Sequence, residues 1–234
     1  MKPRLLDILE KDAPVLQVAL DYTRLEDALY LASLLRREIG DKYWIAEAGT
    51  PLIKAAGISS VRYLSEVVKP VPVVADTKTA DTGDLETMIA SDAGATALTV
   101  LGCTLDETIE AAAKEAHRKG LALIVDMVAV RDIEKRAEEV EALGADIVEL
   151  HIGIDAQRAL GMTAADLYGI VKRVSDRLSV YVSVAGGIDQ KSAPLLAEAG
   201  ASIIVVGGAI RKSRDPAATA KTIIESIRKT RNQQ

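Results

Sequence analysis

The chain has 234 residues, of which 49% are apolar and only 3% aromatic, with no phenylalanine. This length and composition are typical of one large domain with an aliphatic core, such as buried parallel strands covered by helices. The net charge of −5 and the absence of a broad basic patch argue against a nucleic-acid-binding protein.

Three further features limit the class of protein. Residues 1–13 carry scattered charges and lack the apolar run of a signal peptide. No segment contains the uninterrupted run of about 18 apolar residues that a membrane span needs. The single cysteine, Cys103, excludes an intramolecular disulfide framework. We therefore expect a cytoplasmic protein that binds neither membranes nor nucleic acids.

Short runs rich in Val, Ile and Ala alternate with longer amphipathic segments along the chain. The short runs predict strands at residues 15–20, 43–48, 71–76, 95–100, 121–126, 146–150, 179–184 and 202–206. The intervening segments, such as 24–38, 104–118 and 131–143, have apolar residues at three- and four-residue spacing, which predicts helices. The recurring sequences DAGA, ALGA and EAGA carry glycine where a helix ends before the next strand.

Strands that alternate with helices predict right-handed βαβ units and a parallel sheet. Eight such units without a linker predict a single-domain (β/α)8 TIM barrel over residues 14–228, with an open doubly wound sheet as the alternative. Residues 1–13 are expected to form an N-terminal extension, either a short helix across the barrel bottom or a subunit contact. Residues 229–234 are expected to form a frayed tail.

Polar or glycine residues follow most of the predicted strands. They are Asp21, Glu47, Asp76, Lys78 and Asp126, then His151, Asp155 and Gln157 after the sixth strand, and the pairs Gly186-Gly187 and Gly207-Gly208. A polar residue entering a loop explains any single position, but it explains the whole set less well. Because barrel active sites form at the carboxyl ends of the strands, this set predicts an active site there.

The stretch ADTKTADTG, residues 75–83, concentrates charge at the end of the third strand. Alternation of side chains along a strand predicts that Asp76 and Lys78 face the same way, toward the barrel mouth. Nearby carboxylates would keep Lys78 charged. Asp81 lies beyond the strand, in the loop. A salt-bridged strand end is the alternative, but it does not explain why Glu47, Asp21 and Asp126 should be aimed at the same space.

The residue types suggest a division of labour among these positions. Glu47 and Asp76 offer the hard oxygen ligands that suit Mg2+. His151 could abstract a proton from carbon, although a lone histidine is more often structural. The glycine pairs after the last two strands are typical of a barrel phosphate site, to which Arg211 could add charge or could simply be solvated. Together these groups suit a small phosphorylated sugar that reacts through a metal-stabilised enediolate.

The chain resembles the 3-hexulose-6-phosphate synthase family, a member of the orotidine 5'-monophosphate decarboxylase suprafamily, over about residues 12–228. The resemblance is carried by LQVALDYTRLEDAL (16–29), EAGTPLIKAAGI (47–58), ADTKTADTG (75–83), TVLGCTLDETI (99–109), VDMVAV (125–130), HIGIDAQ (151–157), VAGGI (184–188) and VVGGAI (205–210). It implies a Mg2+-dependent, reversible aldol condensation of formaldehyde with ribulose 5-phosphate to D-arabino-3-hexulose 6-phosphate.

The resemblance also implies roles for individual residues. Glu47 and Asp76 would ligate the metal, Lys78 would stabilise the enediolate, and His151 would abstract the proton. Asp21 and Asp126 would position substrate, and the glycine pairs would bind its phosphate. Asp81 would be donated across a homodimer interface into the partner's site.

Two alternatives to the synthase remain open. One is 3-keto-L-gulonate 6-phosphate decarboxylase, which carries Arg where Ile154 stands and Glu where Asp126 stands; both differences favour the synthase. The other is a non-catalytic phosphosugar-binding barrel, against which the set Asp76, Lys78 and His151 argues.

Overall fold

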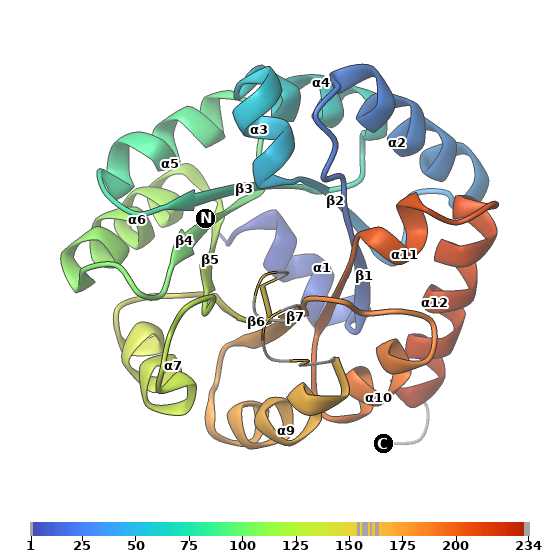
Figure 1. The fold of residues 1–234 in the computed structure, drawn as a ribbon. Helices are drawn as coiled ribbons and strands as arrows, with labels where there is room; N and C mark the ends of the chain where they lie inside the picture. Colours follow the sequence, from blue (N-terminus) through green and yellow to red (C-terminus); the bar gives the residue numbers. More distant parts are fainter. Residues whose placement is uncertain (1, 154, 156–158, 160, 162–163, 232–234) are drawn as a thin grey trace.

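The computed structural model describes residues 2–153, 155, 159, 161 and 164–231, and its chain folds into a closed barrel of eight parallel strands in sequence order (Figure 1). The strands are β1 (Val15–Ala19), β2 (Trp44–Ala48), β3 (Val73–Thr79), β4 (Ala97–Leu101), β5 (Ala122–Asp126), β6 (Ile147–His151), β7 (Tyr181–Ala185) and β8 (Ile203–Val206). Strand β1 pairs with both β2 and β8, which closes the sheet. The predicted (β/α)8 barrel is therefore confirmed, and the open-sheet alternative is wrong.

Helices surround the barrel between successive strands (Figure 1). They are α2 (Leu25–Ile39), α3 (Thr50–Ala56), α4 (Ser59–Val68), α5 (Gly83–Asp92), α6 (Asp106–Lys119), α7 (Ile133–Ala142), the 3-10 turn η1 (Ala164–Leu167), α9 (Tyr168–Arg177), α10 (Ser192–Glu198), α11 (Gly208–Arg211) and α12 (Pro216–Arg231). Helix α12 continues past the predicted boundary at residue 228. None of the described helices is both long and apolar enough to cross a membrane.

The strands are buried on both faces, which explains their continuous aliphatic sequences. One set of side chains packs outward against the helices, as Leu16 and Val18 of β1 do. The alternate set points into the barrel, where Val15, Ala19 and Ile45 belong to a separate apolar cluster. The core is therefore two concentric layers, divided by the sheet.

The helix α1 (Arg4–Asp12) closes the N-terminal end of the barrel. Its buried residues Leu5 and Leu9 belong to the same cluster as the inward-facing strand residues, and Figure 1 shows α1 behind the barrel centre. Because one end is sealed by apolar residues, only the carboxyl ends of the strands leave the interior open to solvent. The polar strand ends therefore meet at a single mouth.

Candidate active site

The end of β3 departs from regular strand geometry. Ala75 pairs with Leu98 and Thr79 pairs with Val100, so β3 carries extra residues between these two points. Within this bulge Lys78 has a φ of 46°, a left-handed conformation that costs a non-glycine residue about 1–3 kcal/mol. Thr99 Oγ1 compensates by accepting a hydrogen bond from the Lys78 backbone N–H at 2.9 Å. The bulge, rather than simple alternation, therefore sets the direction of the Lys78 side chain.

The Lys78 ammonium joins the ends of two strands. Its Nζ lies 3.1 Å from Asp76 Oδ1 on β3 and 2.6 Å from Asp126 Oδ2 on β5. Burial works to lower the pKa of Lys78, but the two carboxylates outweigh it and the pKa is raised. Lys78 is thus a fixed, permanently charged cation at the mouth of the barrel, as predicted for a charged lysine.

The carboxylate of Asp76 is held by donors from the neighbouring strand β4 and from the first residue of α3. Oδ1 accepts from Thr99 Oγ1 at 2.8 Å, and Oδ2 accepts from the N–H of Thr50 at 3.2 Å. The Thr50 hydroxyl lies 2.6 Å from Oδ2 and 2.8 Å from the Asp76 carbonyl oxygen. Since that hydroxyl has a single proton, it donates to only one of these two oxygens at a time.

His151, at the end of β6, faces Asp126. Its Nδ1 lies 3.0 Å from Asp126 Oδ2 and 3.9 Å from Glu149 Oε1. Burial tends to lower the pKa of His151, but the hydrogen bond and charge of Asp126 raise it overall. Burial tends to raise the pKa of Asp126, but His151 and Lys78 lower it. Asp126 is fully buried and anchored by the Val128 N–H at 2.8 Å, so it fixes both cationic partners.

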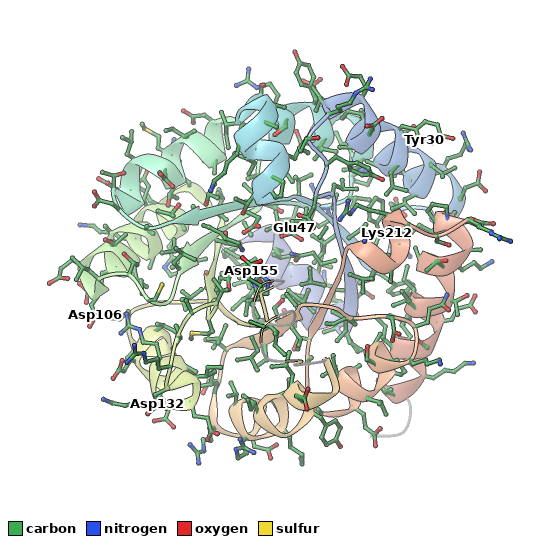
Figure 2. The ribbon with its side chains drawn as sticks, viewed as in Figure 1. Tyr30, Glu47, Asp106, Asp132, Asp155 and Lys212 are labelled. Atoms are coloured by element: carbon green, nitrogen blue, oxygen red, sulfur yellow. The ribbon has the colours of Figure 1, made fainter. Side chains whose placement is uncertain are left out.

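Glu47 lies inside the barrel wall on β2, and Figure 2 places it near the barrel axis. It is 5% exposed, and its Oε2 has no hydrogen-bond partner among the described residues. Its pKa is raised well above the ordinary value, first by burial and then by the negative charges of Asp76, Glu149 and Asp21. A nearby cation would stabilise the charged form of the Glu47 carboxylate.

Asp21, just beyond β1, interacts with the side chain of Arg211 on α11. Arg211 donates to the Asp21 carbonyl oxygen at 2.9 Å, and its Nη2 lies 3.8 Å from Asp21 Oδ2. Burial raises the pKa of Asp21, while Arg211 opposes the rise. A Cβ at Gly49 would lie 2.1 Å from Asp21 Oδ1, so glycine is needed there for this carboxylate to reach the mouth.

The two glycine pairs lie at the same rim, after β7 and β8. Gly186 has a φ of 110°, and a Cβ there would lie 2.3 Å from the Ile152 carbonyl oxygen. Gly187 also has positive φ, whereas a Cβ at Gly208, the first residue of α11, would meet no atom within 4 Å. Gly186 is thus needed for close packing against the backbone of Ile152, whereas the space beside Gly208 is open to a ligand.

Among the residues that the structure describes, Asp81 makes no hydrogen bond or ion pair with the network around Lys78: it is exposed, and its Oδ1 accepts from the Thr82 N–H at 2.8 Å. Asp155 is exposed and lies near the barrel axis in Figure 2. Ile154 and Gln157, singled out from the sequence, lie outside the described residues.

Glu149, Thr50 and Thr99 are site residues that the sequence analysis missed. Glu149 is 3% exposed, and its Oε2 accepts from Ser183 Oγ at 3.0 Å. Burial, followed by repulsion from Asp126, raises its pKa to about 7. The sequence could have predicted this position, because strand alternation places Glu149 on the same face as His151, two residues later. The threonines carry no comparable signal.

Within the described part of the chain, one group of three residues has the spacing of a metal site. Ligand atoms of Asp126, Glu149 and His151 all lie within 4.8 Å of one another. This group differs from the predicted pair Glu47 and Asp76. The ammonium of Lys78, 2.6 Å from Asp126, already supplies a positive charge to the group of three.

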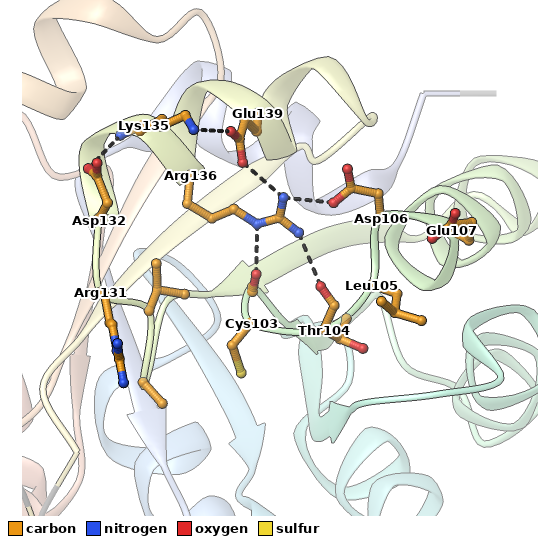
Figure 3. Close-up of a pocket in the computed structure, with 13 residues that line it drawn as sticks. Cys103, Thr104, Leu105, Asp106, Glu107, Arg131, Asp132, Lys135, Arg136 and Glu139 are labelled. Atoms are coloured by element: carbon orange, nitrogen blue, oxygen red, sulfur yellow. Dashed lines mark hydrogen bonds and ion pairs between the residues drawn. The ribbon is translucent and has the colours of Figure 1, made fainter.

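A separate cavity of about 680 Å³ opens between the loops that follow β4 and β5 (Figure 3). Arg136 crosses it, with Nη1 2.7 Å from Asp106 and 3.0 Å from Glu139, and with a further bond from Nε to the Gly102 carbonyl. Through these contacts Arg136 links the loop that follows β4 to the helix that follows β5. In Figure 2 Asp106 and Asp132, which line this cavity, lie toward the outer rim, away from Glu47.

Comparison with known proteins identifies the family to which the chain belongs. A family model described as orotidine 5'-phosphate decarboxylase / HUMPS family matches residues 14–223. The 3-hexulose-6-phosphate synthase of Mycobacterium gastri is 42% identical over 214 residues, covering 91% of this chain and 99% of that protein.

Solved structures agree with the sequence relatives. A crystal structure of 3-hexulose-6-phosphate synthase superposes with a TM-score of 0.84 at 40% identity, covering 91% of this chain and 99% of that one. The 3-keto-L-gulonate-6-phosphate decarboxylase of Vibrio cholerae superposes with a TM-score of 0.80 at 27% identity, covering 93% and 99%. The resemblance to the synthases is confirmed, as is the expectation of a lyase. The chain belongs to the orotidine 5'-phosphate decarboxylase / HUMPS family.

Proposed function

We propose that this protein is a Mg2+-dependent aldolase that condenses formaldehyde with D-ribulose 5-phosphate to D-arabino-3-hexulose 6-phosphate, reversibly and through an enediolate. The observation that supports it most is the chain of contacts from Asp76 through Lys78 and Asp126 to His151. This chain puts a fixed cation and an oriented imidazole at one mouth. Such a pair suits removal of a proton from a carbon next to a carbonyl.

The phosphate of the substrate would bind at the glycine pairs after β7 and β8, where backbone N–H groups can approach it. Asp21 lies between this region and the Lys78 network, because a Cβ at Gly207 would be 3.2 Å from its Oδ2. We assign Asp21 and Asp155 to the sugar hydroxyls. Arg211 holds Asp21 in place and adds positive charge near the phosphate loops.

His151 is the base in this proposal. When Nδ1 donates to Asp126, Nε2 is left as the free acceptor, so the carboxylate fixes both the tautomer and the direction of the ring. Removal of a C1 proton of the ketose phosphate by Nε2 leaves one negative charge, shared between the C2 oxygen and C1, while the C1 hydroxyl keeps its proton. The Lys78 ammonium neutralises part of this charge. C1 then adds to the carbon of formaldehyde, and the alkoxide that forms takes up the proton held by His151.

Glu47 and Asp76 fit a divalent cation better than the group Asp126, Glu149 and His151. Glu47 is a buried carboxylate whose pKa is raised by burial and by the negative charge of Asp76 and its other acidic neighbours, so a cation there would stabilise its charged form. The Lys78 ammonium lies closer to the competing group, 2.6 Å from Asp126, than to Asp76, at 3.1 Å. A bound Mg2+ would supply positive charge for the enediolate oxygens. In this proposal Glu47 and Asp76 hold the cation, and Asp126 orients the base His151.

Product formation tests the activity. The enzyme should consume ribulose 5-phosphate only when formaldehyde is present, lose this activity in EDTA and regain it with Mg2+. 3-Keto-L-gulonate 6-phosphate is the matched second substrate, and CO2 release from it should be much slower. Activity that is indifferent to EDTA would remove the metal from the proposal, and preferential CO2 release would favour the decarboxylase.

We further propose a homodimer in which Asp81 completes the partner's site, because Asp81 is exposed and makes no contact with Lys78 in its own chain. Asp81→Ala and Lys78→Ala should each be nearly inactive. Mixing the two variants under conditions that exchange subunits should restore activity, since each heterodimer then contains one complete site. No recovery, with subunit exchange verified by mass, would place Asp81 in its own site or outside both.

A further inference from the structure

Gln17 is a polar residue that the proposed reaction does not use. It lies in the middle of β1 and is 0% exposed. Its neighbours two residues away, Val15 and Ala19, point into the barrel, so Gln17 points there too. Neither its Oε1 nor its Nε2 has a hydrogen-bond partner among the described residues. A fully buried amide without partners is unfavourable, which calls for a reason.

The register of β1 and β2 places Gln17 next to Glu47 in the barrel interior, one inward-facing position nearer the N-terminal ends of the strands. Gln17 pairs with Ile45, and Ala19 pairs with Glu47. Since Ile45 belongs to the interior cluster, Glu47, two residues on, points inward as well. Glu47 Oε2 is likewise buried and has no hydrogen-bond partner in the described part of the chain. The Gln17 amide interacts with the Glu47 carboxyl, although no hydrogen bond of ordinary geometry joins them.

We propose that Gln17 is a positioning residue for Glu47: its Nε2 donates to the buried Oε2 of Glu47 and leaves the other carboxylate oxygen for a divalent cation. The juxtaposition of buried amide and carboxylate atoms that lack partners among the described residues supports this. Partners that orient a metal ligand typically contribute 10–100-fold to metal affinity. The inference rests on the metal site of the proposed function.

The test is Mn2+ binding to metal-free protein, followed by electron paramagnetic resonance of the free ion. Mn2+ suits the same oxygen ligands as Mg2+. Gln17→Met keeps the length of the side chain but cannot donate. It should bind Mn2+ about 10-fold or more weakly. The metal-free variant should stay folded with a melting temperature close to wild type, because methionine fills the same buried space as Gln17.

Ile45→Val is the matched control, since it removes packing beside Gln17 without changing a hydrogen bond. It should lower the melting temperature and leave Mn2+ affinity unchanged. If Gln17→Met binds Mn2+ as tightly as wild type, the positioning role is wrong while the metal site stands. If wild type itself binds no Mn2+, both are wrong, whereas the aldolase activity is judged separately by product formation.

Discussion

Replacing Lys78 by alanine should reduce kcat/KM by about 10³-fold, because a single preorganised charge at a developing oxyanion is worth about 10²–10³ in rate and Lys78 also separates two carboxylates. Its ammonium contacts both Asp76 and Asp126. Without it, their repulsion would shift both side chains. Initial rates of hexulose phosphate formation at saturating Mg2+ would measure the loss.

Lys114→Ala is the matched control for Lys78→Ala, since Lys114 is an exposed lysine on α6. It should retain wild-type activity. Circular dichroism and melting curves of both variants would separate loss of chemistry from loss of folding. A folded Lys78→Ala enzyme with near-normal kcat/KM would show that the enediolate charge is stabilised elsewhere.

The activity of the wild-type enzyme should fall at acidic pH with a midpoint above the ordinary pKa of histidine, because His151 acts as a base only when neutral. The Asp126 carboxylate favours the imidazolium and so raises the pKa of His151. In Asp126→Asn this interaction is lost, burial then dominates, and the pKa falls. The acid limb of the kcat/KM profile should therefore move to lower pH.

Asp126→Asn should also lower the plateau of that profile, by about 10²-fold, since acid–base groups typically contribute 10²–10⁴. Asparagine keeps the shape of the side chain but no longer neutralises Lys78 or orients His151. A full pH profile of kcat/KM separates the two effects. An acid limb that stays in place in Asp126→Asn would mean that His151 is not the titrating base.

The barrel and the location of the site were predictable because both follow from strand periodicity. Aliphatic runs between helical segments indicate buried parallel strands, and every predicted strand overlaps an observed one. The strand ends Asp76, Asp126 and His151 then converge because the sheet closes in sequence order. Glu149 could have been found by the same counting, one inward position before His151.

The detailed contacts were not predictable, because they depend on irregular backbone. The bulge in β3 and the positive φ of Lys78 carry no residue signature such as glycine or asparagine. Regular alternation along the strand correctly predicted that Lys78 lies beside carboxylates. The irregular backbone of β3, however, is what directs its side chain there. The unpartnered atoms of Gln17 and Glu47 depend on packing in three dimensions.

The central claim is that His151, at the mouth of this barrel, removes a proton from C1 of ribulose 5-phosphate. Exchange of the C1 hydrogen with solvent tests it. The enzyme would be incubated with Mg2+ and ribulose 5-phosphate in D2O, without formaldehyde, and C1 followed by proton NMR. We predict that one of the two C1 hydrogens is replaced by deuterium and that His151→Asn abolishes this exchange. Hexulose phosphate synthesis by wild type without any C1 exchange, or unchanged exchange in His151→Asn, would contradict it.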